Sequence, residues 1–91
     1  MLTATEIEHR ITEHVRQILL ASNKPAEGLA ADKPLADGLG LDSLEMAGLF
    51  IALEDDFKVD PFLTRFSIVD MRSIADLTRA YSAMTCEPAT A

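Results

Sequence analysis

Apolar residues recur at helical spacing in three separate stretches of the chain. In residues 1–21 they return about once per helical turn between polar side chains, which predicts an amphipathic helix. Thr3 with Glu6, or Thr5 with Glu8, has the spacing of a capping box at the start of this helix. The residues predicted to face the core are Ile7, Ile11, Val15, Ile18 and Leu19.

A second helix is predicted from Ser43 to Phe57. Asp42 stands at the cap position and Glu45 in the first turn, where carboxylates favour a helix N-terminus. One apolar stripe predicts the core face of this helix and consists of Met46, Leu49, Phe50, Leu53 and Phe57. A second apolar line is displaced around the helix and consists of Leu44, Ala47 and Ile51. This line either widens the core stripe or forms a small exposed docking strip, and the exposed strip is the favoured interpretation.

A long loop is predicted between these two helices, because residues that disfavour helices interrupt the pattern. The interrupting residues are Pro25, Gly28, Pro34, Gly38 and Gly40. We expect the loop to be held to the core by apolar anchors and to contain a short helical turn. The anchors are Leu29, Leu35, Leu39 and Leu41.

Two more helical segments are predicted towards the C-terminus. Asp60-Pro61 is typical of a helix start and opens a short segment over residues 62–66. Ser73 opens the last helix, whose inward residues are Ile74, Leu77 and Tyr81. The predicted fold class is all-α: a small four-helix bundle with three main helices, a short third helix and a long first loop. One domain is expected over residues 1–82, followed by a flexible tail over residues 83–91.

Composition narrows the classes of partner and location. The 91 residues carry a formal net charge of −7, which argues against nucleic acids and anionic membranes as partners and favours basic protein surfaces. Cys86 is the single cysteine, so no disulfide framework is possible within the chain. No apolar stretch approaches the roughly 18 residues of a membrane span, and Glu6 and Glu8 are unlike a signal peptide. A cytoplasmic monomer is expected.

Catalysis and metal binding are both disfavoured by the residue pattern. Ser43 lacks the Gly-x-Ser-x-Gly surroundings of a hydrolase nucleophile, and no base is placed to activate it. His9 and His14 lie on or near the polar face of the first helix and are interpreted as solvated, because no cysteine or third histidine completes a metal site. The acidic residues lack the spacing of an EF-hand loop. We therefore expect no enzymatic activity and no metal.

Acidic residues gather around the second helix. Seven of them, against the single basic residue Lys58, occupy this part of the chain: Asp37, Asp42, Glu45, Glu54, Asp55, Asp56 and Asp60. A solvated face is the simple interpretation. Because the acids flank both ends of the helix that begins at Ser43, they are also placed to steer basic partner surfaces towards this serine.

The segment around Ser43 resembles the acyl carrier protein family. The resemblance rests on Asp42-Ser43-Leu44 after a loop rich in Gly and Leu, and on Ala52-Leu53-Glu54-Asp55-Asp56-Phe57 closing the same helix. It covers roughly Thr5 to Tyr81. It implies that a phosphopantetheinyl transferase attaches a 4′-phosphopantetheine arm from coenzyme A to Ser43. The thiol at the end of this arm then carries an acyl or aminoacyl group as a thioester. Ser43 is then an acceptor and not a catalyst, and a phosphate there would benefit from the free N–H groups of the helix start.

The resemblance also implies a partner surface on the second helix. Asp42, Glu45, Glu54 and Asp55 would meet basic residues of partner enzymes, and Leu44, Ala47 and Ile51 would make apolar contacts. The implied partners are the transferase, a loading ligase or acyltransferase, and a downstream synthase or transferase with a basic docking surface.

Three details favour a discrete carrier of a specialised pathway over the housekeeping fatty-acid carrier. Gly48 stands where many fatty-acid carriers have an acid, and the span from Phe57 to the last helix is longer. Asp42 stands where peptidyl carriers of large assembly lines usually have His or Asn. A polyketide-like carrier, as in antibiotic biosynthesis, and a D-alanyl or other aminoacyl carrier both remain open. The remote alternative is an acidic interaction module that is never modified.

The predicted core leaves little space for a long alkyl chain, so a short or polar cargo that stays largely exposed is expected. The residues expected to fill it are Ile11, Val15, Leu49, Leu53, Phe57, Ile74 and Leu77, with Phe50, Phe62 and Phe66 around the second and third helices.

Overall fold

Three helices make up the secondary structure of the described part of the chain, which is residues 3–58, 67 and 70–85 of a computed structural model. The helices are α1 (Ala4–Ala21), α2 (Ser43–Phe57) and α3 (Ile74–Thr85). No strand occurs among these residues, and the only bridge between them joins Pro34 and Ser73. The all-α class is therefore confirmed. A fourth, short helix is not confirmed, because the segment over residues 62–66 lies outside the described residues.

Helix α1 begins at a capping box, as the sequence predicts. The Glu6 N–H donates to the Thr3 hydroxyl oxygen over 3.1 Å, and the Thr3 N–H donates to the Glu6 carboxylate over 3.0 Å. Of the two spacings that could cap this helix, the structure uses the first. The buried residues of α1 are Ile7, Ile11, Val15 and Leu19, and Ile18 packs half-buried against the same cluster.

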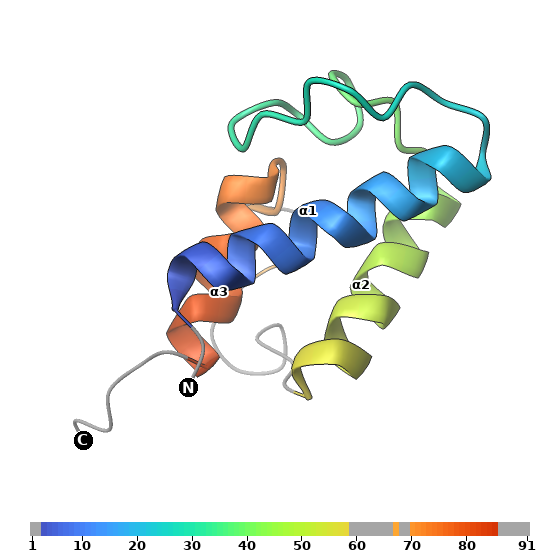
Figure 1. Ribbon diagram of the computed structural model, residues 1–91. Helices are drawn as coiled ribbons and strands as arrows, with labels where there is room; N and C mark the ends of the chain where they lie inside the picture. Colours follow the sequence, from blue (N-terminus) through green and yellow to red (C-terminus); the bar gives the residue numbers. More distant parts are fainter. Residues whose placement is uncertain (1–2, 59–66, 68–69, 86–91) are drawn as a thin grey trace.

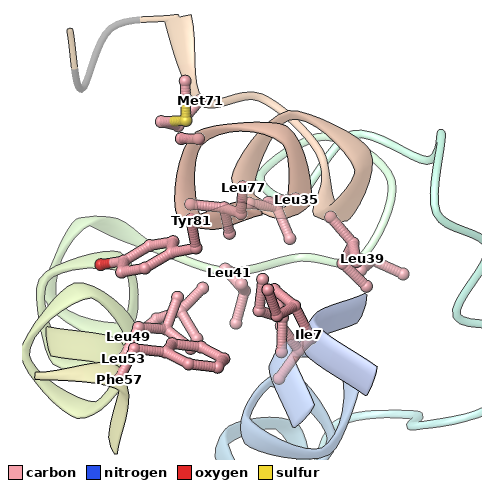
Figure 2. Packing of buried hydrophobic residues seen from close by; sticks show 14 of the residues in the cluster. Ile7, Leu35, Leu39, Leu41, Leu49, Leu53, Phe57, Met71, Leu77 and Tyr81 are labelled. Atoms are coloured by element: carbon pink, nitrogen blue, oxygen red, sulfur yellow. The ribbon is translucent and has the colours of Figure 1, made fainter. Parts of the chain in front are cut away.

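Helix α1 packs against both other helices and lies across them (Figure 1). The core between the three is aliphatic, with Phe57 of α2 beside Tyr81 of α3 at a ring-centroid separation of 5.2 Å. Figure 2 shows Leu35, Leu39 and Leu41 of the loop entering the same cluster. The predicted core residues of α2 and α3 that are buried are Leu49, Leu53, Phe57, Ile74, Leu77 and Tyr81, whereas Met46 and Phe50 are half-buried. Phe62 and Phe66 lie outside the described residues.

The long loop over residues 22–42 is tied to the start of α3. The Leu35 N–H donates to the Arg72 carbonyl over 2.7 Å, and the Ala75 N–H donates to the Ala31 carbonyl over 2.8 Å. Figure 1 shows the loop passing from the end of α1 to the start of α3 and back to the start of α2. The loop is thus a structured arm that delivers the chain to Ser43.

A tight turn inside this loop matches the predicted helical turn. The N–H groups of Gly38 and Leu39 both donate to the Pro34 carbonyl over 2.9 Å. A Cβ atom at Gly38 would lie 2.7 Å from that same carbonyl oxygen, which explains why glycine occupies the position.

Helix α3 continues to Thr85. The last turn of α3 runs through the boundary expected at residue 83, and the flexible tail stays a prediction. Residues 86–91, which include Cys86, lie outside the described residues.

Candidate functional site

The start of α2 presents Ser43 on the surface. The Asp42 carboxylate accepts the Glu45 N–H over 2.8 Å, and the Asp42 N–H donates to the Glu45 carboxylate over 2.9 Å, so a complete capping box begins the helix. The Met46 N–H donates to the Asp42 carbonyl over 2.9 Å. Ser43 is the first helical residue and its side chain is exposed. Its hydroxyl is open to a reaction partner and is held by a fixed backbone.

This helix start suits a covalently attached phosphate. Among the described residues, the N–H groups of Ser43 and Leu44 have no hydrogen-bond acceptor. Unpaired N–H groups and the positive end of the helix dipole favour an anion at this position. Gly40, at φ +83°, turns the chain into the cap without a side chain that would obstruct the approach.

The second apolar line of α2 is on the surface. The side chains of Leu44 and Ile51 are 82% and 70% exposed, and Ala47 between them is exposed. The interpretation that this line widens the core is wrong, because the core face of α2 is occupied by Leu49, Leu53 and Phe57. This line runs along one side of α2 and begins beside Ser43. We call it the Leu44–Ile51 strip (Leu44, Ala47 and Ile51).

The acidic residues around α2 divide into two groups. Glu54 and Asp55 are exposed, and the Asp55 carboxylate makes only a long 3.7 Å contact with Lys58. Asp56 instead turns towards α1, where it pairs with Arg10 over 3.1 Å and with His14 over 3.0 Å. The interpretation of His14 as a solvated side chain is therefore wrong. His9 is exposed.

The Glu45 carboxylate also points inward. Its side chain is only 11% exposed and forms an ion pair with Lys24, and it accepts a hydrogen bond from the Ser22 hydroxyl. Because these groups occupy the carboxylate, Glu45 does not offer the free charge that a partner enzyme would bind. Asp42 uses its carboxylate as the helix cap. Of the four acids that the resemblance assigns to partner contacts, Glu54 and Asp55 are the two that project outward.

The bonds to Glu45 alter its acidity. Hydrogen bonds from Lys24, then Ser22, then the Asp42 N–H lower the pKa of this carboxyl from 4.5 to about 2. In the unfolded chain Glu45 takes up a proton as the pH falls below its ordinary pKa, whereas in the folded chain it stays ionised. Its contribution to stability is therefore complete above pH 4.5 and is lost as the pH falls towards 2.

We expect Glu45→Gln to flatten the acid side of the stability profile. The variant has no carboxylate to protonate, so the free energy of unfolding should fall less steeply than in the wild type between pH 4.5 and about 2. Urea unfolding at several pH values measures this slope. Equal slopes for the two proteins would show that the Glu45 contacts do not persist in solution.

Sequence reasoning did not identify Ser22 and Lys24 as parts of the site. They follow α1 in the chain, and helical periodicity carries no signal for them, because they meet Glu45 across the whole loop.

No cluster of three His, Cys, Asp or Glu residues that could hold a metal ion occurs in the described ranges. Within those ranges, no helix has both the length and the apolar character to cross a membrane.

A hollow of about 470 Å³ lies beside α2, one turn after Ser43. Met46 borders it from α2 and Met71 from the segment before α3, while Asp37 and Arg72 bring opposite charges to it. Residues 34–36 of the loop complete its lining. This hollow lies outside the buried core, which is filled by Leu49, Leu53, Ile74 and Leu77.

A family model described as "phosphopantetheine attachment site" matches residues 9–81. The matched segment contains most of α1, the whole loop, α2 with Ser43 at its start, and α3 as far as Tyr81. No curated protein and no solved structure matches the chain.

Proposed function

The chain belongs to the phosphopantetheine attachment site family, whose members carry a covalently attached 4′-phosphopantetheine, and on that basis we propose that Ser43 is its attachment residue. The observation that carries this proposal is the exposed hydroxyl at the first position of a capped helix with unpaired N–H groups. The arm, once bound, supplies a thiol that holds an acyl or aminoacyl group as a thioester. The protein acts as a carrier and not as a catalyst.

The role of this chain in the modification is to present the Ser43 hydroxyl to the transferase. Asp42 and Glu45 hold the first turn of α2 through reciprocal hydrogen bonds, so the backbone at Ser43 stays in place while a transferase docks. The helix start then stabilises the negative charge of the phosphodiester. The proton of the hydroxyl leaves to a base of the transferase.

The partner surface that we propose combines the Leu44–Ile51 strip with Glu54 and Asp55. The strip supplies exposed apolar area beside Ser43, and the two acids supply negative charge towards the other end of the same helix. This arrangement suits the transferase, a loading ligase or acyltransferase, and a synthase or transferase with basic docking surfaces. A cytoplasmic monomer working with these enzymes remains our proposal for the setting.

We propose a discrete carrier of specialised biosynthesis, of the polyketide-like kind, with a D-alanyl or other aminoacyl carrier as the second candidate. The hollow beside Met46 supports a short or polar cargo, because Asp37 and Arg72 bring charge to an otherwise apolar lining. The intact mass of the protein isolated from its native host tests the function directly. It should equal the chain plus the arm plus the cargo, and a mass equal to the bare chain would favour the unmodified interaction module.

A short or polar cargo should disturb only the surface beside Ser43. We expect loading of the holo-protein with a short acyl or aminoacyl group to shift NMR resonances of residues 43–46 and of the hollow, including the Met46 and Met71 methyls. Resonances of Leu53 and Leu77 should stay in place, because both side chains are fully buried in a filled core. Holo and loaded spectra provide the comparison. Large shifts at Leu53 and Leu77 with a short cargo would contradict this model of an exposed group.

A further inference from the structure

A cluster of side chains fastens the end of α1 to the start of α2. The Lys24 ammonium binds the Glu45 carboxylate and also donates to the Gly40 carbonyl over 2.7 Å. The Ser22 hydroxyl donates to the second oxygen of the same carboxylate. We call this group the Lys24 clamp (Ser22, Lys24, Gly40 and Glu45). It joins segments that lie 21 positions apart in the chain, counted from Lys24 to Glu45.

The two groups that Lys24 binds lie on either side of Ser43 in the sequence. Gly40 is where the loop turns into the helix, and Glu45 closes the capping box with Asp42. One ammonium therefore holds the backbone before the serine and the side chain after it. Lys24 is itself anchored, because its N–H donates to the Leu19 carbonyl over 2.8 Å at the end of α1.

We propose that Lys24 is a positioning residue for the modification of Ser43, acting through Glu45 and Gly40. The inference rests on the proposed function, since it concerns how well Ser43 is presented to the transferase. Without the ammonium, no cation links the Gly40 carbonyl of the loop to the Glu45 carboxylate of the helix. The first turn of α2 then frays more often, and the hydroxyl spends less time in the direction that the reaction needs.

A positioning role and a simple charge effect predict opposite results. Lys24→Met makes the chain more negative, so a transferase with a basic surface should associate at least as well as with the wild type. Loss of positioning instead lowers kcat. We expect Lys24→Met to reduce the kcat of modification about fivefold with little change in KM, because reaction rates are sensitive to small errors of orientation. Lys24→Arg retains the charge and the donors and should restore most of the rate.

Lys33→Met is the matched control. Lys33 is exposed, lies in the same loop and has no ion pair within the described part of the chain, so its loss changes the net charge equally. We expect it to be modified at the wild-type rate. Glu45→Gln combined with Lys24→Met should be no slower than the slower of the two single variants, because both substitutions remove the same interaction.

Hydrogen exchange of the unmodified protein provides a measurement that needs no transferase. The N–H groups of Asp42, Glu45 and Met46 should exchange faster in Lys24→Met than in Lys33→Met, while those in the middle of α2 stay protected. Unchanged exchange at the helix start would overturn the clamp itself. Faster exchange with an unaltered kcat would show that the Lys24 clamp only stabilises the helix start. That result would overturn the proposal that Lys24 positions Ser43 for modification. A wild type that no transferase modifies would instead overturn the proposed function, whatever the exchange shows.

Discussion

Ser43→Ala is expected to remain unmodified under conditions in which the wild type gains the mass of one phosphopantetheine group. The substitution removes the hydroxyl that would form the phosphodiester and leaves every bond of the capping box in place, because Asp42 and Glu45 make that box without Ser43. The free energy of unfolding should change by no more than about 0.5 kcal/mol, as is usual for an exposed position. A promiscuous transferase, coenzyme A and intact mass spectrometry provide the measurement.

Ser67→Ala is the control for this experiment. Ser67 is an exposed serine outside the helices, so its loss should leave the mass gain intact. Circular dichroism of both variants should show wild-type helix content. Mass gain by Ser43→Ala would place the arm on another residue, and no gain by the wild type, under conditions that convert a known carrier, would refute the attachment altogether.

The second large effect is expected from Glu54→Lys combined with Asp55→Lys. Both side chains are exposed on α2, and reversal of their charge opposes a basic partner surface during encounter. We expect kcat/KM for modification or loading to fall by about tenfold or more at low ionic strength, mainly through slower association. The fold should persist, since the core face of α2 is unaltered and lysines suit the last turn of a helix. Wild-type rates should also fall as salt is added.

The control for the charge reversal is Glu27→Lys combined with Asp32→Lys. These two exposed acids of the loop give the same change in net charge away from α2. We expect this control to retain most of the wild-type rate. Equal losses in both double variants would mean that only the total charge matters, and no loss in the α2 variant would mean that Glu54 and Asp55 do not take part in the encounter with a partner.

The sequence predicted the three described helices well because local rules decide them. Asp42 as a cap defined the start of α2 correctly, and the leucine anchors of the loop were found because a buried loop needs apolar contacts. The end of α3 at Thr85 has no clear signal in the sequence, because its last residues contribute little to the apolar stripe from which the helix was recognised. The hollow beside Met46 depends on how three separate segments pack, and no pattern along the chain contains that information.

Only the local features of the candidate site could be predicted from the sequence. Ser43 and the exposed strip follow from positions on one helix. The fate of each acid does not, because it depends on partners far along the chain. Glu45 is occupied by Lys24, and Asp56 by Arg10 and His14. Periodicity assigns a side chain to a face but does not say which distant cation that face will meet, so two of the acids grouped around α2 turned out to serve the fold.

The hydrogen bonds between the loop and α3 bear on the order in which the chain folds. Residues 31 and 35 pair with residues 75 and 72, so the arm that leads to Ser43 is fastened only after a segment made much later along the chain has docked. Closing so long a stretch of chain is slow compared with forming a helix. The individual helices can therefore form early, whereas the surroundings of the serine are among the last parts of the protein to be completed.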